Sequence, residues 1–343
     1  MEALLLLIPL LLVPYALFLL YPVRIEKIYK DFKDLSLLPP SAVFLYSYEF
    51  HIHTQFSYDS LGKPDDLFRA RDEAGIDYVI VTDHEVDYFK EFADQRTLVG
   101  VEKKINDEKG NLLGDLIEVG DIKVISHHFR KYRWKLPREK EYLFELINLK
   151  DALVHKKGRL LFYLLFAPFL YPIAKSYYLK NFTKVINPEE FAKRYLKEGW
   201  ENKIICGLDH HVKVYIREVG LRFLFPSYRF SFSLMRGFVL SRRKINTKEE
   251  FLKAFGEFPH LTSFSEKPTL FWTEGNSLYY YAPYSKVLTV LLTKDHKKAF
   301  LGSNGKLELK SGSYVLVGYT YLFRIGRVFF GVKPLFVSDI IKI

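Results

Sequence analysis

The sequence is poor in sulfur, with one cysteine and two methionines among 343 residues. A single thiol, Cys206, excludes an internal disulfide framework. The chain also lacks internal repeats and low-complexity segments, and disorder is not expected over most of its length. Apolar residues make up 49% of the sequence, which is enough at this length for one large domain and a smaller one.

Acidic residues are fewer than basic ones, 40 against 51, which leaves a net charge of +11 at pH 7. This balance favours anionic partners, namely phosphate esters, nucleic acid or an acidic lipid surface. The charge alone does not choose among the three.

Charged residues are missing altogether from Ala3 to Val23, a leucine-rich stretch of about 20 residues that is long enough to cross a bilayer core. The stretch lacks the basic start of an export signal, since Glu2 precedes it. We therefore predict a membrane-spanning helix. The basic residues after it predict that the rest of the chain is cytoplasmic: Arg24, Lys27, Lys30 and Lys33. A linker ending at Pro39-Pro40 leads to the body of the protein near Ser41.

A second apolar run, from Arg159 to Pro172, is too short to span a bilayer comfortably. It is either a buried helix or a segment that lies in a membrane interface, with basic residues beside it.

From Ser41 onward, strand-like runs alternate with helical ones, which is typical of parallel βαβ units. The predicted strands are Val43 to His53, Tyr78 to Thr82, Leu98 to Val101, Ile122 to Ser126, Ala152 to His155 and Ile204 to Gly207. The predicted helices include Pro64 to Ala74 and Thr247 to Phe255. Such an arrangement closes into a barrel or forms an open sheet, with ligands at the C-terminal ends of the strands.

The sequence after about Leu261 has a different pattern, with short strand-like runs separated by turns. These runs are Ser277 to Tyr281, Val287 to Thr293, Lys306 to Leu309, Ser313 to Val317 and Arg327 to Phe330. We expect a small all-β domain here.

Histidines gather at the predicted strand ends. Eight of the ten lie in five places: His51 and His53, His84, His127 and His128, His155, and His210 and His211. Carboxylates accompany them, at Asp59, Asp83, Glu102 and Asp209. Alternate residues of a strand project to the same face, so His51 and His53 can share one metal ion. Together these residues predict a metal cluster at the strand ends.

Three segments resemble motifs of the PHP (polymerase and histidinol phosphatase) superfamily of metal-dependent phosphoesterases. HIHTQFSYDS is similar to the opening H-x-H-T-x-x-S motif, DEAGIDYVIVTDHE to the T-D-H segment and GLDHH to the late G-x-D-x-H motif. The resemblance covers about residues 45 to 215, and the ending Val332 to Ser338 resembles the CehA/McbA-like branch. It implies an α/β fold, a distorted seven-stranded βα barrel (TIM-like) over 41–260. An anchor and linker over 1–40 would precede the barrel, and an all-β domain over 261–343 would follow it.

The resemblance also implies two or three metal ions, with Glu102, Asp209 and His84 as catalytic residues. The first ion would be held by His51, His53, Glu102 and Asp209, the second by Glu102, His155 and one of His127 and His128, and the third by Asp59, His84 and His211. Strand offset favours His128 over His127.

The roles of two neighbouring residues are predicted separately. His210 is expected to point away from the ions, because Asp209 and His211 share one face of an extended chain. Asp83 either orients the imidazole of His84 or caps a helix.

The mixture of histidine and carboxylate ligands favours Zn, Mn or Fe over Mg or Ca. We expect a membrane-anchored hydrolase that cleaves phosphomonoesters or phosphodiesters with a metal-activated water at a di- or trinuclear site. Three alternatives stay open: a non-phosphate ester hydrolase of the same fold, a nuclease acting on short nucleic acid, and a non-catalytic membrane binding protein.

Overall fold

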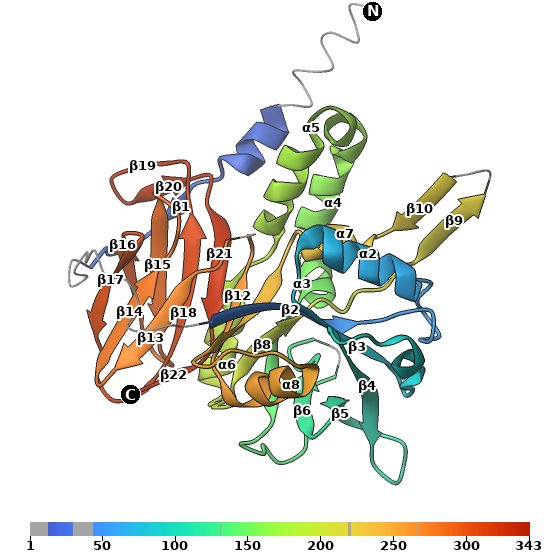
Figure 1. Ribbon diagram of the computed structural model, residues 1–343. Coiled ribbons are helices and arrows are strands. Elements are labelled where there is room, and N and C mark those ends of the chain that lie inside the picture. Colours follow the sequence, from blue (N-terminus) through green and yellow to red (C-terminus); the bar gives the residue numbers. More distant parts are fainter. Residues whose placement is uncertain (1–12, 30–43, 131, 219–220, 266) are drawn as a thin grey trace, which may run out of the picture.

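The computed structural model describes residues 13–29, 44–130, 132–218, 221–265 and 267–343. Its centre is a mixed sheet of fourteen strands (Figure 1), in the order β16-β15-β18-β21-β12-β11-β2-β3-β4-β5-β6-β7-β8, with β22 paired beside β18. Three smaller sheets join β1 to β20 and β19, β9 to β10, and β13 to β14 and β17.

One half of the large sheet carries the histidine segments. Its strands are β2 (Phe44–Ile52), β3 (Tyr78–His84), β4 (Thr97–Asn106), β5 (Leu112–Val119), β6 (Ile122–Ser126), β7 (Leu143–Asn148) and β8 (Ile204–Gly207). The pairs β2-β3, β3-β4, β6-β7 and β7-β8 are parallel, whereas β5 is antiparallel to both of its neighbours.

The other half of the sheet is antiparallel. Its strands are β11 (Arg236–Ser241), β12 (His260–Ser263), β21 (Lys333–Ser338), β18 (Ser313–Thr320), β15 (Val287–Leu292), β16 (Lys297–Leu301) and β22 (Ile341–Lys342). The two halves meet where β11 pairs with β2, with Val239 opposite Tyr46.

The predicted seven-stranded βα barrel is wrong. The described strands form one mixed sheet in which the outer edge of β2 pairs with β11, and β5 breaks the parallel order. Among the described residues, no ladder joins β8 to β2. The end of β2 instead meets the residues just after β8, through the isolated bridge between Ile52 and His210 and the hydrogen bond from Leu208 N to Phe50 O at 2.9 Å. The C-terminal strands were expected as a separate β unit, but they continue the same sheet through β12 and β21.

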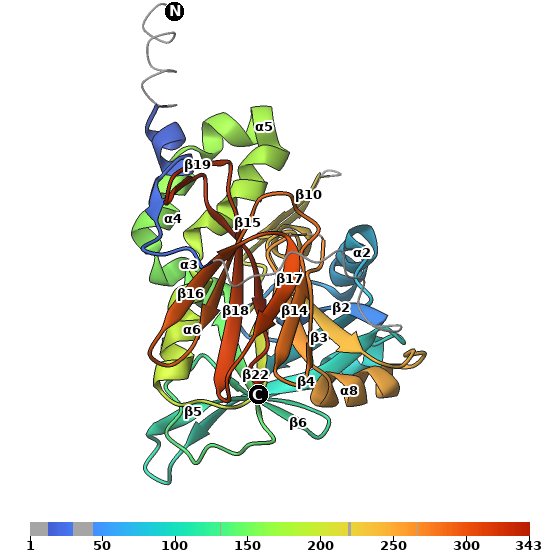
Figure 2. The ribbon, with the colours of Figure 1, turned by 90° about the vertical axis from the view of Figure 1, so that its left-hand side faces the viewer.

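Short strands complete the β structure: β1 (Val23–Arg24), β9 (Val214–Glu218), β10 (Leu221–Phe225), β13 (Leu270–Glu274), β14 (Ser277–Tyr281), β17 (Asn304–Glu308), β19 (Phe323–Ile325) and β20 (Val328–Phe330). The β13-β14-β17 sheet lies beside β15 and β18 (Figure 2), and Leu278, Leu307 and Leu316 share a core between the two layers. These strands therefore form a β sandwich at one side of the molecule.

The helices are α2 (Pro64–Ala74), α3 (Leu149–His155), α4 (Lys157–Leu165), α5 (Ala167–Phe182), α6 (Pro188–Lys197), α7 (Tyr228–Phe232) and α8 (Lys248–Glu257), with 3-10 turns η1 (Tyr88–Phe92) and η2 (Thr183–Val185). Helix α2 has the predicted bounds, because Pro64 suits a first helical position and Gly75, at φ 63°, terminates it. The predicted strand Ala152 to His155 is wrong: these residues belong to α3, which the side chain of Asn148 caps by accepting from Asp151 N.

The predicted membrane-spanning helix from Ala3 to Val23 is also wrong for the described part of the chain, where no helix is long and apolar enough to cross a membrane. Residues 1–12 of that stretch lie outside the described residues. The remainder is helical only over 13–19, and β1 begins at Val23. The single-pass membrane location and its cytoplasmic orientation rested on this helix and fall with it. The predicted linker to Pro39-Pro40 lies largely outside the described residues.

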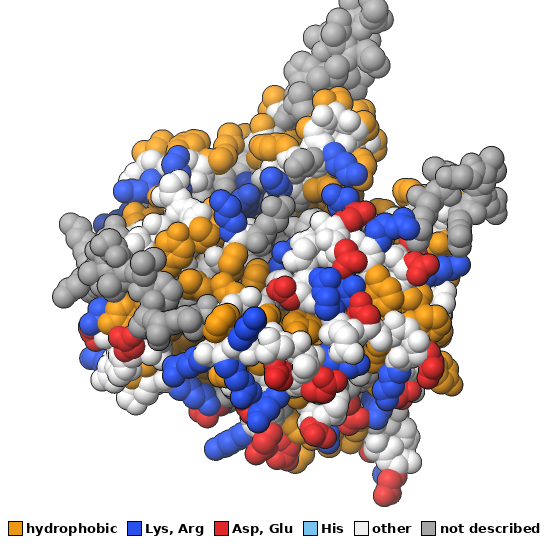
Figure 3. Space-filling model, in the orientation of Figure 1, with side chains coloured by type: hydrophobic (Ala, Val, Ile, Leu, Met, Phe, Trp, Pro, Cys, Tyr) orange, Lys and Arg blue, Asp and Glu red, His pale blue; other side chains and the backbone are white. Residues whose placement is uncertain are grey.

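The second apolar run folds into α4 and the start of α5. Tyr163 and Phe166 are buried in the main core, whereas Leu161 and Phe169 are exposed. Apolar side chains gather on the surface at this end of the molecule, where α5 and β19 lie (Figure 3), and Ile325 of β19 is among those exposed.

Candidate metal centre

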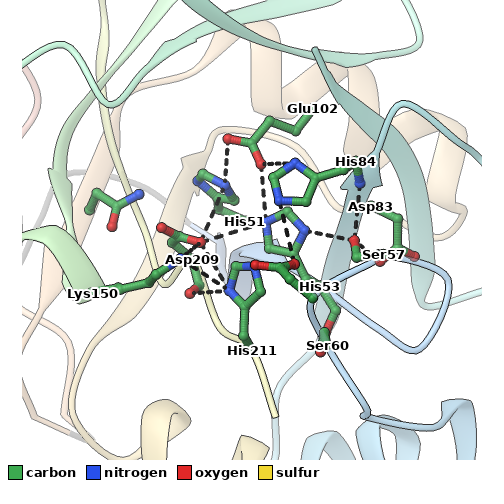
Figure 4. A network of polar contacts seen from close by, with 12 residues as sticks. His51, His53, Ser57, Ser60, Asp83, His84, Glu102, Lys150, Asp209 and His211 are labelled. Carbon is green, nitrogen blue, oxygen red and sulfur yellow. Dashed lines mark hydrogen bonds and ion pairs between the residues drawn. The ribbon is translucent and has the colours of Figure 1, made fainter. Parts of the chain in front are cut away.

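The structure brings eight of the predicted ligands together near the ends of β2, β3, β6 and β8 and at the middle of β4: His51, His53, Asp59, His84, Glu102, His127, Asp209 and His211. Figure 4 labels six of them, His51, His53, His84, Glu102, Asp209 and His211. Glu102 lies at their centre. Its Oε1 is 3.2 Å from Nε2 of His51 and 3.1 Å from Nε2 of His127. Its Oε2 is 3.2 Å from Nε2 of His53 and 3.0 Å from Nδ1 of His84. One buried carboxylate thus faces four imidazoles.

Asp209 is the second carboxylate of the cluster. Its Oδ1 is 3.6 Å from Nε2 of His53, and its Oδ2 is 3.5 Å from Nε2 of His127. On its other side, Oδ1 is 3.1 Å from Nδ1 of His211 and accepts from Lys150 Nζ at 3.1 Å. Asp209 therefore connects the histidines around Glu102 to a further group of side chains.

That further group is formed by Asp59, His84 and His211. Asp59 Oδ1 is 3.0 Å from Nε2 of His211 and 3.6 Å from Nε2 of His84. The ring of His53 stacks against both histidines, with centroids 4.1 Å from His211 and 4.4 Å from His84. These are the residues that the sequence assigned to a third ion.

The inward atoms of the cluster make no hydrogen bond to any described residue, although they are buried. They are Nε2 of His51, His53 and His211, both carboxylate oxygens of Glu102, Oδ2 of Asp209 and Oδ1 of Asp59. Buried polar atoms nearly always make hydrogen bonds, so a set of buried ligand atoms that face one another without a hydrogen bond fits a site for a cation. Four His, Asp and Glu groups here have ligand atoms within 4.8 Å of one another: His53, His84 and His211; His51, His53 and Asp209; His51, Glu102 and His127; and His127, Asp151 and Asp209. The protein therefore has buried side chains positioned to hold a metal ion.

Three of these ligands have unusual backbone angles. His51, His127 and Asp209 have φ values of 63°, 53° and 48°, in the left-handed region that non-glycine residues rarely adopt. Each such residue costs about 1 to 3 kcal/mol, and strain of this kind is concentrated at functional sites. The strained turns end their strands abruptly and direct the three side chains to the same place.

His51 is held by a carboxylate that the sequence reasoning missed. Glu145, buried in β7, lies 2.7 Å from Nδ1 of His51, so that Nδ1 donates its proton and Nε2 is left as the ligand atom. Gly207 makes room for this pair: a Cβ at that position would lie 2.0 Å from Glu145 Oε1 and 2.8 Å from His51 Cβ.

His53 is oriented by Ser57, whose Oγ lies 3.0 Å from its Nδ1. Ser57 donates in turn to Asp83 Oδ1 at 2.8 Å, and Asp83 also accepts from Thr54 N at 2.6 Å. Asp83 therefore neither orients His84 nor caps a helix, the two roles predicted for it, and instead fixes the loop after His53. Burial lowers the pKa of His53 to about 3, which keeps its imidazole neutral and able to bind a metal.

His127 is oriented by Asp151, which lies 2.7 Å from its Nδ1. Arg130 in turn pairs with Asp151. A carboxylate on the outer nitrogen of a histidine is a common support for a metal ligand, because it fixes the ring and its tautomer. Asp151 lies on α3, in the segment that the sequence reasoning assigned to a strand.

The pKa values of the two central carboxylates are shifted down. Burial alone would raise the pKa of Glu102, but His51, His127 and His53 hold it well below its usual range. Burial acts on Asp209 in the same direction, and His211, His51 and Lys150 outweigh it. Both carboxylates therefore stay ionised, as a ligand of a cation must be.

Three predicted residues lie outside the cluster. His128 points away from it, with Nε2 2.8 Å from Glu198 and its ring against Trp200, so that His127 and not His128 faces Glu102. His155 ends α3 and bonds to Glu190 at 2.9 Å. His210 points away, as predicted, with Nδ1 2.7 Å from Ser231 Oγ.

Besides Glu145 and Asp151, sequence reasoning missed Lys150 and Asp115. Lys150 reaches Asp209 from α3, and Asp115 is buried in β5. Burial, together with the charge of Glu102, raises the pKa of Asp115 to about 8, so it is protonated at neutral pH. A carboxylate within the apolar run LFELIN was the signal that could have found Glu145, since unpaired acids are almost never buried.

Comparison of the chain with protein-family models, with curated proteins and with solved structures finds no match.

Proposed function

We propose that the protein is a metal-dependent hydrolase of phosphomonoesters or phosphodiesters. The observation that carries the proposal is the position of Glu102, whose two oxygens lie 3.0 to 3.2 Å from four histidine nitrogens while making no hydrogen bond to any described residue. Two or three ions of Zn, Mn or Fe suit this donor set of nitrogen and oxygen atoms.

The ligands divide into three overlapping sets. His51, His53, Asp209 and Glu102 would hold one ion, and His127 with Glu102 a second, so that Glu102 is shared by the two sets. His84, His211 and Asp59 would hold a third. When bound, such ions supply Lewis acidity toward ester oxygens and a water of lowered pKa.

The residues of the chain itself favour an anionic substrate. Lys150 contacts Asp209, Lys213 contacts Asp59 at 3.1 Å and Arg130 contacts Asp151, so each of these three carboxylates has a partly exposed cation beside it. Cations around a cleft raise the local concentration of anions and can bind phosphate oxygens. The proposal for a phosphate ester over an uncharged ester rests on these side chains.

Two tyrosines flank the cluster and favour an aromatic or other planar substrate group. Tyr58 is 76% exposed and stacks on His84 with centroids 4.9 Å apart, and Tyr132 meets the ring of His127 edge-on at 5.5 Å. Lys104, two residues after Glu102, lies 5.6 Å from the Tyr132 ring. A planar leaving group could stack on the exposed face of Tyr58.

The test uses the purified full chain, prepared without chelators, with metal content measured by elemental analysis. p-Nitrophenyl phosphate, bis(p-nitrophenyl) phosphate, p-nitrophenyl acetate and a short oligonucleotide are then compared as substrates. We expect two or three equivalents of transition metal and hydrolysis of a phosphate ester. Less than one equivalent of metal, or hydrolysis of the acetate alone, would contradict the proposal.

The matched variants are Glu102→Gln and Glu198→Gln. Each removes the charge of a carboxylate bound to one member of the His127-His128 pair, but only Glu102 faces the cluster. We expect Glu102→Gln to lose at least one ion and about 100-fold or more of the activity, because the ions then repel without a bridging charge. Glu198→Gln should keep its metal content and its activity. Full metal content and turnover in Glu102→Gln would rule out the bridged site.

A further inference from the structure

A second cavity, distinct from the metal centre, lies between α6, η2, the C-terminal strands and the N-terminal segment. Its volume is about 690 Å³, within the range of small-molecule sites, roughly 300 to 1,000 Å³. Figure 1 shows the N-terminal segment, in medium blue, running from beside α5 to β19 and β20. Apolar side chains form much of the wall, among them Phe18, Ile25, Leu288, Val290 and Val332.

The acidic residues of this cavity already have cationic partners. Glu189 pairs with Lys193 at 2.7 Å and with Lys297 at 3.1 Å. Glu190 pairs with Lys156 at 2.7 Å and with His155 at 2.9 Å. Each carboxylate is therefore compensated without help from the other basic residues of the cavity.

Two lysines of the cavity have no such compensation. Lys184 of η2 and Lys333 of β21 are both half-buried, and among the described residues no carboxylate forms an ion pair with either. Lys184 donates to the carbonyl of Leu19. Burial, together with the charge of Lys333, lowers the pKa of Lys184 to about 8. Two neighbouring ammonium groups in a partly buried site are unfavourable unless an anion lies between them.

We propose that this cavity binds an amphipathic anion, with its headgroup on Lys184 and Lys333 and its apolar chain along Phe18, Leu288 and Val290. A headgroup of one or two negative charges would satisfy both ammonium groups with charge-assisted hydrogen bonds. The apolar wall would bury the chain, which a small inorganic anion cannot exploit. A fatty-acid carboxylate and a lipid phosphate share this chemistry.

The test measures binding to the purified, delipidated full chain by equilibrium dialysis below the micellar concentration of each probe. Oleate presents a carboxylate, oleoyl lysophosphatidate presents a phosphate, and oleyl alcohol has the same chain without charge. We expect saturable binding of about one equivalent of at least one anion, with oleyl alcohol about tenfold weaker or more. The tighter of the two anions identifies the headgroup.

The test variant is a double one, Lys184→Met combined with Lys333→Met. Its matched control is Lys253→Met, which removes an exposed lysine of α8 away from the cavity. The double variant should weaken anion binding about tenfold or more while its thermal stability without ligand is kept or rises, because a repulsive pair is removed. Lys253→Met should bind as the unaltered protein does. Equal binding of oleyl alcohol and the anions, or unchanged binding by the double variant, would overturn the proposal. The result does not depend on the metal centre.

Discussion

His127 and His128 are adjacent in the sequence and have opposite surroundings in the structure. Nε2 of His127 lies 3.1 Å from Glu102, whereas His128 lies 2.8 Å from Glu198 and accepts from Trp134 N at 3.0 Å. A simple alternation of side chains favoured His128 as the ligand. The left-handed φ of His127 breaks that alternation at the end of β6, and a sequence pattern does not show such a break.

This difference predicts opposite effects for two alanine variants. His127→Ala should lower turnover of p-nitrophenyl phosphate about 100-fold or more, with one ion fewer bound. His128→Ala should keep its turnover but lose about 2 to 4 kcal/mol of unfolding free energy, because its ring is packed and bonded at both nitrogens. Kinetics, metal analysis and urea denaturation of both variants check this. The reverse assignment would be indicated if His128→Ala alone lost metal.

The sequence predicted those residues of the cluster whose side chains can bind a metal and which also stand at the end of a predicted strand. His51, His53, His84, Glu102 and Asp209 stand at strand ends in the sequence and converge in the structure. The supporting residues were harder to find, because Glu145 and Asp151 act through contacts across elements that no local pattern reveals.

At the scale of the elements, the last residue of β8, Gly207, leaves the space in which Glu145 contacts His51. Gly207→Ala would place a Cβ 2.0 Å from Glu145 Oε1, so that Glu145 has to move away from His51. We expect metal affinity to fall about 10- to 100-fold, as when the outer support of a ligand is lost, while the fold persists. Competition with a chromophoric chelator measures the affinity.

Gly158→Ala is the matched control for that experiment, because a Cβ there meets nothing within 4 Å and lies on α4. It should leave metal affinity unchanged. If Gly207→Ala binds metal as tightly as Gly158→Ala, the role assigned to Glu145 is wrong.

Asp339 accepts hydrogen bonds from three backbone N–H groups, and its surroundings predict that the unfolding free energy depends on pH. Its Oδ1 accepts from Ile204 N at 2.6 Å and Ile340 N at 2.7 Å, and its Oδ2 accepts from His260 N at 3.4 Å. Burial raises its pKa to about 7 from 3.8, although these bonds oppose the shift. Between about pH 4 and 7 the folded chain therefore keeps a proton that the unfolded chain releases.

The unfolding free energy that this proton contributes is fully present below pH 4 and is lost as the pH rises to about 7. Relative to Asp339→Asn, the unaltered protein should lose on the order of 2 to 4 kcal/mol of unfolding free energy between pH 4 and 8. Urea denaturation of both proteins across this range gives the difference, in which other titrating groups cancel. A constant difference would show that Asp339 is ionised when folded.

At the scale of the whole molecule, the cluster joins segments from across the first half of the sheet. Ligands from β2, β3, β4, β6 and β8 meet there, so bound ions would stabilise the folded chain and not the unfolded one. We expect a chelator to lower the Tm by about 5 °C or more. Glu102→Gln, with fewer ions, should respond less. An unchanged Tm on chelation of the unaltered protein would contradict a structural contribution from the ions.

The helices and strands of the fold were easier to predict than their arrangement. Pro64 to Ala74, Ile122 to Ser126 and Ser277 to Tyr281 are found with the bounds expected from local pattern. The order of strands was not predicted, because β11 was not recognised and its pairing with β2 depends on residues far apart in the sequence. Apolarity alone also misled the prediction at the N-terminus, where Tyr15 and Leu19 are buried against the rest of the protein.

The position of β2 between β3 and β11 has a consequence for synthesis. Tyr46 of β2 and Ile245, just after β11, are in contact although 199 residues separate them. At about 5 to 20 residues per second, a ribosome needs roughly 10 to 40 seconds to make that interval. During this time one edge of an aromatic-rich strand has no partner, and unpaired edges promote aggregation. We therefore expect the nascent chain to be most prone to aggregation before β11 emerges.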